Sequence, residues 1–117
     1  MKAYQNKMTL DNKNNELISL SSQFDNINKN KFKIQEQIDT FELILKEKDR
    51  LYLELNEVWK DGEMKYFLND INSEINQTHN KISNELNNEL DELNKQKYLL
   101  ENRQQELLFE LKKERIT

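Results

Sequence analysis

Hydrophobic residues in the first half of the chain recur at alternating intervals of three and four positions. This spacing places them along one side of an α-helix and is the heptad pattern of helices that pack in pairs. Two lysines, Lys31 and Lys48, occupy positions of the same series. The pattern predicts a helix from about residue 10 to 60 with a packing stripe, the first seam. Its apolar members are Leu17, Leu20, Phe24, Ile27, Ile34, Ile38, Phe41, Leu45, Tyr52, Leu55 and Trp59.

The apolar pattern changes phase at Gly62, the single glycine in a chain without proline. The spacing of the first seam would place four polar residues on the stripe beyond it, Asn69, Ser73, Asn76 and Asn80. A second series predicts another helix, from about residue 63 to 113, in which Thr78, Lys97 and Gln104 interrupt the stripe. The apolar members of this second seam are Leu68, Ile71, Ile75, Ile82, Leu86, Leu90, Leu93, Leu100, Leu107 and Leu111.

A turn at residues 61–62 lets each half keep its own stripe. Glycine readily adopts the left-handed conformation that closes many helices, so we expect Gly62 to be the C-cap of the first helix. One continuous helix is the alternative, since a helical glycine costs only about 1 kcal/mol relative to alanine. The change of phase favours two antiparallel helices. The sequence therefore predicts an all-α helical hairpin as a single domain over residues 1–117, with residues 1–8 frayed and Thr9 or Asp11 as the first N-cap.

A further apolar stripe adjoins the first seam near the predicted turn, at Ile44, Leu51 and Val58. Two adjoining stripes form a face that is wider than one partner helix covers. We therefore expect the hairpin to complete a four-helix bundle or coiled coil with a partner, either a second copy or another helical protein. The expected interface consists of Ile44, Leu51, Val58, Tyr66, Phe67 and Asp70.

Composition and charge point away from catalysis and from nucleic acid. The net charge is −4, and acidic and basic residues are interspersed, so no large basic field exists to bind nucleic acid. The chain has no cysteine and one histidine, His79, which lies in a polar stretch where we expect it to be exposed. Two helices offer no enclosed pocket for reactive groups. We expect a non-enzymatic protein without catalytic residues, cofactor or metal.

No apolar run approaches the roughly 20 residues that a membrane-spanning helix needs. The N-terminal residues also lack the apolar core of a cleaved secretory signal. We therefore expect a cytoplasmic protein, and any export would use a route that cleaves no signal peptide.

The turn and the two long helices resemble the WXG-type superfamily of bacterial type VII secretion. Its members are small helical hairpins with a Trp and a Gly at the bend, and they dimerise into four-helix bundles. Here the bend reads Trp59-Lys60-Asp61-Gly62, which is one residue longer. The export signature of the family, Tyr-x-x-x-Asp/Glu after the second helix, is absent, because Asn102 follows Tyr98 at that spacing. Tyr66 and Asp70 have the spacing, but they follow the turn.

In size and character the chain is also similar to the small helical proteins encoded beside LXG toxins in Gram-positive bacteria. That resemblance implies a targeting factor or chaperone that binds the helical N-terminal domain of a toxin, alone or with a second small helical protein. Two other functions stay open: an export chaperone of a flagellar or type III-like system, and a structural coiled-coil protein. Genes for a toxin or for flagellar components beside this one would separate the three.

The hairpin predicts a short distance between spin labels placed at Asn15 and Asn102. A continuous helix would separate these positions by roughly 130 Å at 1.5 Å per residue. Double electron–electron resonance on the doubly labelled protein distinguishes the two structures. A distance near the length of a continuous helix would contradict the hairpin.

Overall fold

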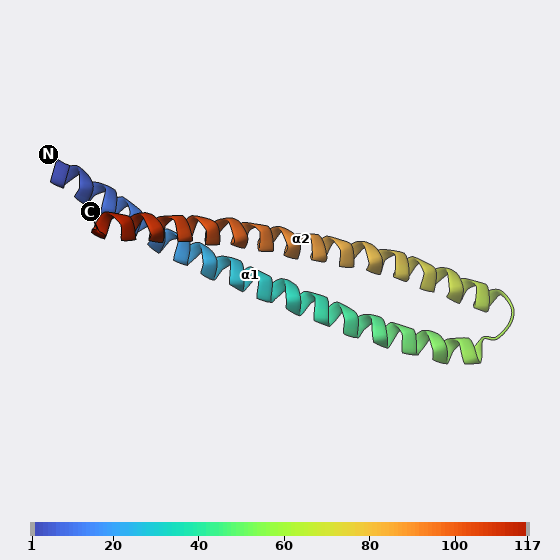
Figure 1. The fold of residues 1–117 in the computed structure, drawn as a ribbon. Helices are drawn as coiled ribbons and strands as arrows, with labels where there is room; N and C mark the ends of the chain where they lie inside the picture. The colour runs from blue at the N-terminus through green and yellow to red at the C-terminus, as the bar shows by residue number, and fades with distance from the viewer. Residues whose placement is uncertain (1, 117) are drawn as a thin grey trace. The chain divides into compact units, whose positions relative to one another are not determined.

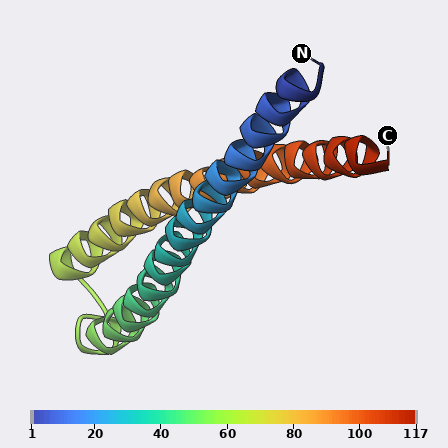
Figure 2. The same ribbon diagram turned by 90° about the vertical axis from the view of Figure 1, so that its left-hand side faces the viewer.

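The computed structural model describes the backbone of residues 2–116 and the side chains of residues 7–114. It contains two helices, α1 (Lys2–Val58) and α2 (Glu63–Ile116), which the turn joins so that the chain runs in opposite directions along them (Figure 1, Figure 2). No strand occurs among the described residues. The all-α helical hairpin that the change of phase predicts is confirmed.

The hairpin divides into two units, and each unit pairs a stretch of α1 with a stretch of α2. The end unit contains the residues up to Phe32 and those from Asp91 onward. The turn unit contains Lys33–Leu90. In both, the seam of α1 faces the seam of α2, so the core is a line of side chains between two helices.

Both helices extend beyond their predicted bounds. α1 begins at Lys2 instead of about residue 10, and α2 continues to Ile116 instead of about residue 113. The predicted fraying of residues 2–8 is therefore wrong, and Met1 lies outside the described residues. This segment lacks an apolar stripe, but it contains good helix formers and no glycine or proline, so nothing interrupts the helix. Thr9 and Asp11 lie inside α1, and neither is its N-cap.

Gly62 has the left-handed backbone conformation predicted for it, with φ of 91°. Its position relative to the helices differs from the prediction. α1 ends at Val58, and the Trp59 amide still donates to the Leu55 carbonyl at 2.8 Å. The Gly62 carbonyl accepts from the amides of Lys65 at 3.2 Å and Tyr66 at 3.5 Å. Gly62 is thus the N-cap of α2 and not the C-cap of α1, because residues 59–61 are needed to cross between the helices.

The first seam is confirmed along its whole length. Each of its apolar members is buried or half-buried, and Lys31 and Lys48 are half-buried at their places in the series. Leu107 of α2 is the most enclosed side chain, with 0 % of its surface exposed. Among the described side chains, the buried core residues are Leu20, Ile27, Ile34, Leu68, Leu107 and Leu111.

The second seam needs correction near the turn. Ile71 and Ile75 are 37 % and 39 % exposed, and Thr78 is exposed, whereas Asn72 and His79 are half-buried. The half-buried Asn72 and His79 continue the alternating spacing from the buried Leu68, and Ile75 lies at the position between them although it is exposed. The prediction placed Ile71 on the seam because it is apolar, and it took Thr78, seven residues later, as an interruption of the stripe. Asn72 and His79 instead contact residues of α1.

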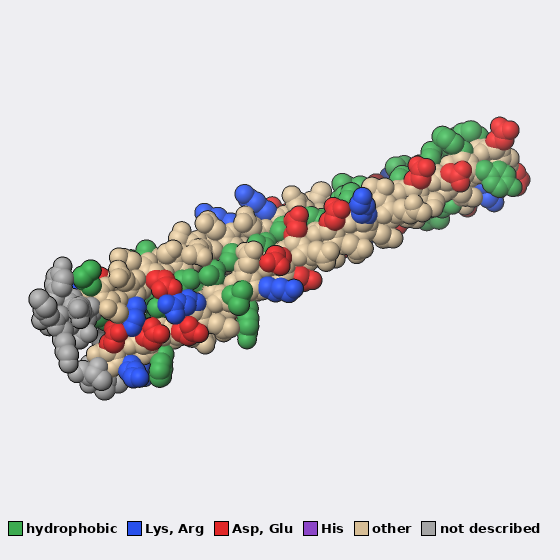
Figure 3. All heavy atoms as spheres, turned by 90° about the horizontal axis from the view of Figure 1, so that it is seen from above, with side chains coloured by type: hydrophobic (Ala, Val, Ile, Leu, Met, Phe, Trp, Pro, Cys, Tyr) green, Lys and Arg blue, Asp and Glu red, His purple; other side chains and the backbone are tan. Residues whose placement is uncertain are grey.

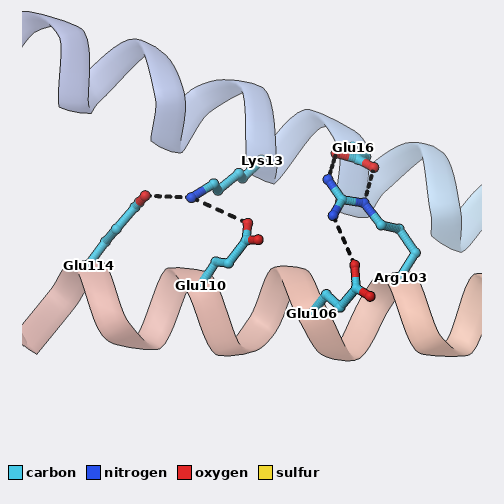
Figure 4. Close-up of polar contacts among 6 residues, drawn as sticks. All are labelled: Lys13, Glu16, Arg103, Glu106, Glu110 and Glu114. Carbon is cyan, nitrogen blue, oxygen red and sulfur yellow. Dashed lines mark hydrogen bonds and ion pairs between the residues drawn. The ribbon is translucent and has the colours of Figure 1, made fainter.

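Ion pairs join α1 to α2 in the end unit (Figure 4). The Arg103 guanidinium donates to both carboxylate oxygens of Glu16, from Nε at 2.7 Å and from Nη2 at 3.1 Å. Lys13 binds Glu110 at 3.4 Å and also Glu114. Hydrogen bonds from Arg103 lower the pKa of Glu16, and the bond to Glu114 raises the pKa of Lys13. These cross-helix pairs fix the pairing of the two segments.

Truncating Leu107 should destabilise the hairpin strongly. Leu107→Ala leaves a cavity in the most enclosed part of the core and should cost about 2–5 kcal/mol of unfolding free energy. Leu108→Ala is the matched control, because its neighbour Leu108 is 52 % exposed; this change should stay within about 0.5 kcal/mol. Urea denaturation followed by circular dichroism measures both. Equal effects of the two variants would contradict the assignment of the core.

Acid should weaken the end unit through Glu16. Because its folded-state pKa lies below the ordinary value of 4.5, its stabilising effect is fully present above pH 4.5. The effect is lost as the pH falls through the lowered folded-state pKa. Glu16→Gln should therefore flatten the acid side of a profile of melting temperature against pH. Glu101→Gln, which changes an exposed residue of the same unit, should leave that profile unchanged. A wild-type acid profile for Glu16→Gln would contradict this role.

Candidate functional site

An apolar groove of about 530 Å³ runs between α1 and α2 in the turn unit. On its α1 side Ile44 and Leu51 are 58 % and 49 % exposed. On its α2 side lie the partly exposed Ile71 and Ile75. The complete lining consists of Thr40, Leu43, Ile44, Glu47, Lys48, Leu51, Tyr52, Leu55, Leu68, Ile71, Asn72 and Ile75.

The groove follows from stripes that lie one position before the seams. Ile44 and Leu51 directly precede the seam residues Leu45 and Tyr52, and Ile71 directly precedes Asn72. In an antiparallel pair of helices, equivalent positions of the two heptads face each other, so these stripes meet on one side of the hairpin. The seams themselves already occupy the space between the helices. The additional isoleucines and leucines therefore remain in water.

Polar side chains form hydrogen bonds between the two helices next to the groove. The Lys48 amine donates to Asn72 Oδ1 at 2.8 Å and to Asn76 Oδ1 at 2.6 Å, and it pairs with Asp49 at 2.7 Å. The Tyr52 hydroxyl donates to Asn69 Oδ1 at 2.6 Å. These bonds satisfy the polar groups of the seam and hold α1 against α2. Three residues of the groove lining, Lys48, Tyr52 and Asn72, thus take part in bonds that join the two helices.

His79 is half-buried, and the prediction that it is exposed is wrong. Its ring stacks on Phe41 with the centroids 4.9 Å apart and the planes 19° from parallel. Its Nε2 lies 3.3 Å from the Ser83 hydroxyl. Histidine can occupy this seam position because the ring packs as an aromatic side chain while its nitrogen keeps a polar neighbour. Among residues 7–114, no cluster of three metal-binding side chains occurs.

The structure brings together only part of the predicted interface. Ile44 and Leu51 line the groove, whereas Val58, Tyr66 and Phe67 are 72 %, 73 % and 59 % exposed outside its lining. Asp70 is also exposed and outside the lining. Sequence reasoning missed Ile71 and Ile75 as members of this surface because it assigned them to the seam. Strict alternating spacing from Leu68 would have identified Ile71.

A chain reversal at Gly62 predicts a packed cluster of Trp59 with Leu55, Val58, Met64, Phe67 and Leu68, and only part of this cluster is formed. Trp59 and Leu55 are half-buried and Leu68 is buried, but the other three expected members, Val58, Met64 and Phe67, are exposed. The connection of residues 59–62 separates the helix ends, so side chains at the last and first turns cannot all converge. Removing the Trp59 ring should cost less than the roughly 3–5 kcal/mol of a fully buried aromatic residue.

Acidic side chains surround the groove. Glu47 and Glu54, which are 68 % and 60 % exposed, share a single cation, Arg50, at 3.0 Å and 2.7 Å. Glu74 lines an adjoining hollow of about 410 Å³ together with Ile44 and Ile75. Hydrophobic and acidic side chains both lie on the right-hand end of the face in Figure 3, with a few Lys or Arg side chains among them. The groove is therefore an apolar surface with an acidic border.

Among the described residues, no helix is long and apolar enough to cross a membrane. No curated protein and no solved structure matches the chain. A family of proteins of unknown function, DUF3958, matches residues 8–114. This match includes most of both helices, the turn and every residue that lines the groove. The chain belongs to the DUF3958 family.

Proposed function

We propose that this protein is a non-enzymatic helical targeting factor, or chaperone, for an LXG toxin of type VII secretion. The observation that carries the proposal is the open apolar groove between Ile44 and Leu51 of α1 and Ile71 and Ile75 of α2. Amphipathic helices bind to apolar grooves of this kind through residues at heptad spacing. The helical N-terminal domain of a toxin supplies such helices.

Burial of the apolar surface of the groove would stabilise a complex with a partner helix. Its four partly exposed aliphatic residues are flanked by Leu43, which is 63 % exposed. A contiguous apolar surface of this extent on a soluble protein is typical of an interaction site. A third helix laid along the groove would cover all five side chains. The polar bonds of Lys48 and Tyr52 would meanwhile keep the two supporting helices in place.

The toxin as partner is supported by the resemblance of the hairpin and its Trp59–Gly62 bend to secreted WXG-type proteins. Tyr66 and Asp70 are exposed and one helical turn apart on α2, so both would be accessible to a secretion component. In a purely structural coiled-coil protein, the seam alone would hold the helices together, and an exposed apolar groove beside it would not be needed. The groove therefore favours a binding function over that alternative.

Aspartate at two positions of the apolar stripe should abolish the complex. The double variant Leu51→Asp/Val58→Asp places charges on the exposed stripe and leaves the seam intact, so the hairpin should keep its helicity. The protein would be mixed with the N-terminal domain of an LXG toxin encoded beside its gene. Size-exclusion chromatography with light scattering would measure the mass of the complex.

Leu53→Asp is the matched control for Leu51→Asp. Leu53 is 64 % exposed on α1, and two residues correspond to about 200° around a helix, so it faces away from the groove. This variant should bind as well as the wild type. If the wild-type protein stays a monomer with the toxin domain and with the other helical proteins of its gene neighbourhood, the proposed function is wrong.

A further inference from the structure

We infer that the occupant of the groove is a basic amphipathic helix from a different protein and not a second copy of this chain. The inference rests on the proposed function, and it specifies the chemistry of the partner. Charge complementarity carries it. The partner helix would present aliphatic residues to the groove and Lys or Arg side chains to its acidic border.

The formal charge of the chain is concentrated in the turn unit. Residues 33–90 contain thirteen Asp and Glu residues and seven Lys and Arg residues, which gives a formal charge of −6. The remaining residues contain nine acidic and eleven basic residues, which gives +2. The overall charge of −4 therefore conceals an excess of acid in the unit that carries the groove.

The border of the groove contributes to this excess. Arg50 is shared between Glu47 and Glu54, so this group of three side chains retains one negative charge. Glu74 adds another on the α2 side. The Lys48 amine does not compensate for them, because it is directed to Asp49, Asn72 and Asn76. A helix lying in the groove thus meets acid along both edges.

A second copy would be a poor occupant. Pairing two grooves face to face would bring two turn units of charge −6 together, and their glutamates would border the same interface. Like charges placed together at an interface suppress association, whereas a complementary basic border favours it and accelerates encounter. The end unit differs, because Lys13 and Arg103 already pair there with glutamates across the helices. The charges of the groove border have no such cross-helix pairing in the described ion pairs.

Two synthetic helices that differ only in their flanking charge test the inference. The groove is lined over residues 40–55 of α1, about 24 Å of helix, so peptides of about 20 residues would fill it. Both peptides carry the same Leu and Ile stripe, and the flanking positions are Lys in one and Glu in the other. Isothermal titration calorimetry with the full chain should show about tenfold tighter binding of the Lys peptide at low salt, and less difference at high salt.

Matched variants of the protein test whether the acidic residues at the groove border, and not its overall charge, cause the preference for the Lys peptide. Glu47→Gln/Glu74→Gln should reduce the preference for the Lys peptide several-fold. Asp39→Asn/Glu42→Gln removes two acidic charges from the part of α1 that lies about 140–160° around the helix from Ile44, and it should keep the preference. Leu51→Asp should remove binding of both peptides. Equal binding of the two peptides, preference for the Glu peptide, binding of neither, or equal effects of the two double variants would overturn the inference.

Light scattering on the protein alone tests the competing occupant. A stable dimer that Leu51→Asp splits and Leu53→Asp does not would overturn the inference, because a second copy would then fill the groove. A monomer that prefers the Lys peptide supports it. These outcomes are distinguishable from a failure of the proposed function, since the peptides need no toxin. A protein that prefers the Lys peptide but ignores the toxin domain would keep the basic partner and exclude the toxin.

Discussion

Two helices that pack together can each bury only one narrow stripe, and this limit determines the structure. The seam of α1 covers the seam of α2, and side chains outside these stripes remain in water. The chain nevertheless places aliphatic residues beside the seam in the turn unit. A two-helix fold cannot enclose them, so they form an open groove. The surface available to a partner is thus a direct consequence of the small number of helices.

Polar side chains determine how α1 and α2 are aligned along the narrow seam. Lys48 and Tyr52 reach across to asparagines of α2, and Glu16 and Arg103 join the helices in the end unit. Leucine and isoleucine pack in several alignments with similar energy, whereas a hydrogen-bonded amine or hydroxyl fits one alignment. Stability comes mainly from the aliphatic core, and the alignment comes mainly from these polar contacts.

The sequence was sufficient to predict the two helices, because heptad spacing is a local property of the chain. The first seam could be followed through Lys31 and Lys48, since its spacing never changes. The prediction of the second seam was wrong at Ile71 and at the interruption Thr78, because the next residues, the polar Asn72 and His79, take the seam positions. Asn72 and His79 are stable at the seam because they contact Lys48 and Phe41 of α1. Contacts between the two helices cannot be read from the local pattern of α2. The same limit applied to the groove, because four of its twelve lining residues come from α2 and the other eight from α1.

The Lys48 amine between Asn72 and Asn76 has a consequence for errors in folding. If α2 were displaced by one heptad in one direction, Lys65 would take the place of Asn72. Two ammonium groups would then meet where an ammonium and an amide meet in the correct structure. A heptad repeat by itself permits such a displacement, because every leucine layer resembles the next. Lys48 therefore makes this neighbouring alignment electrostatically unfavourable and favours the observed pairing over it.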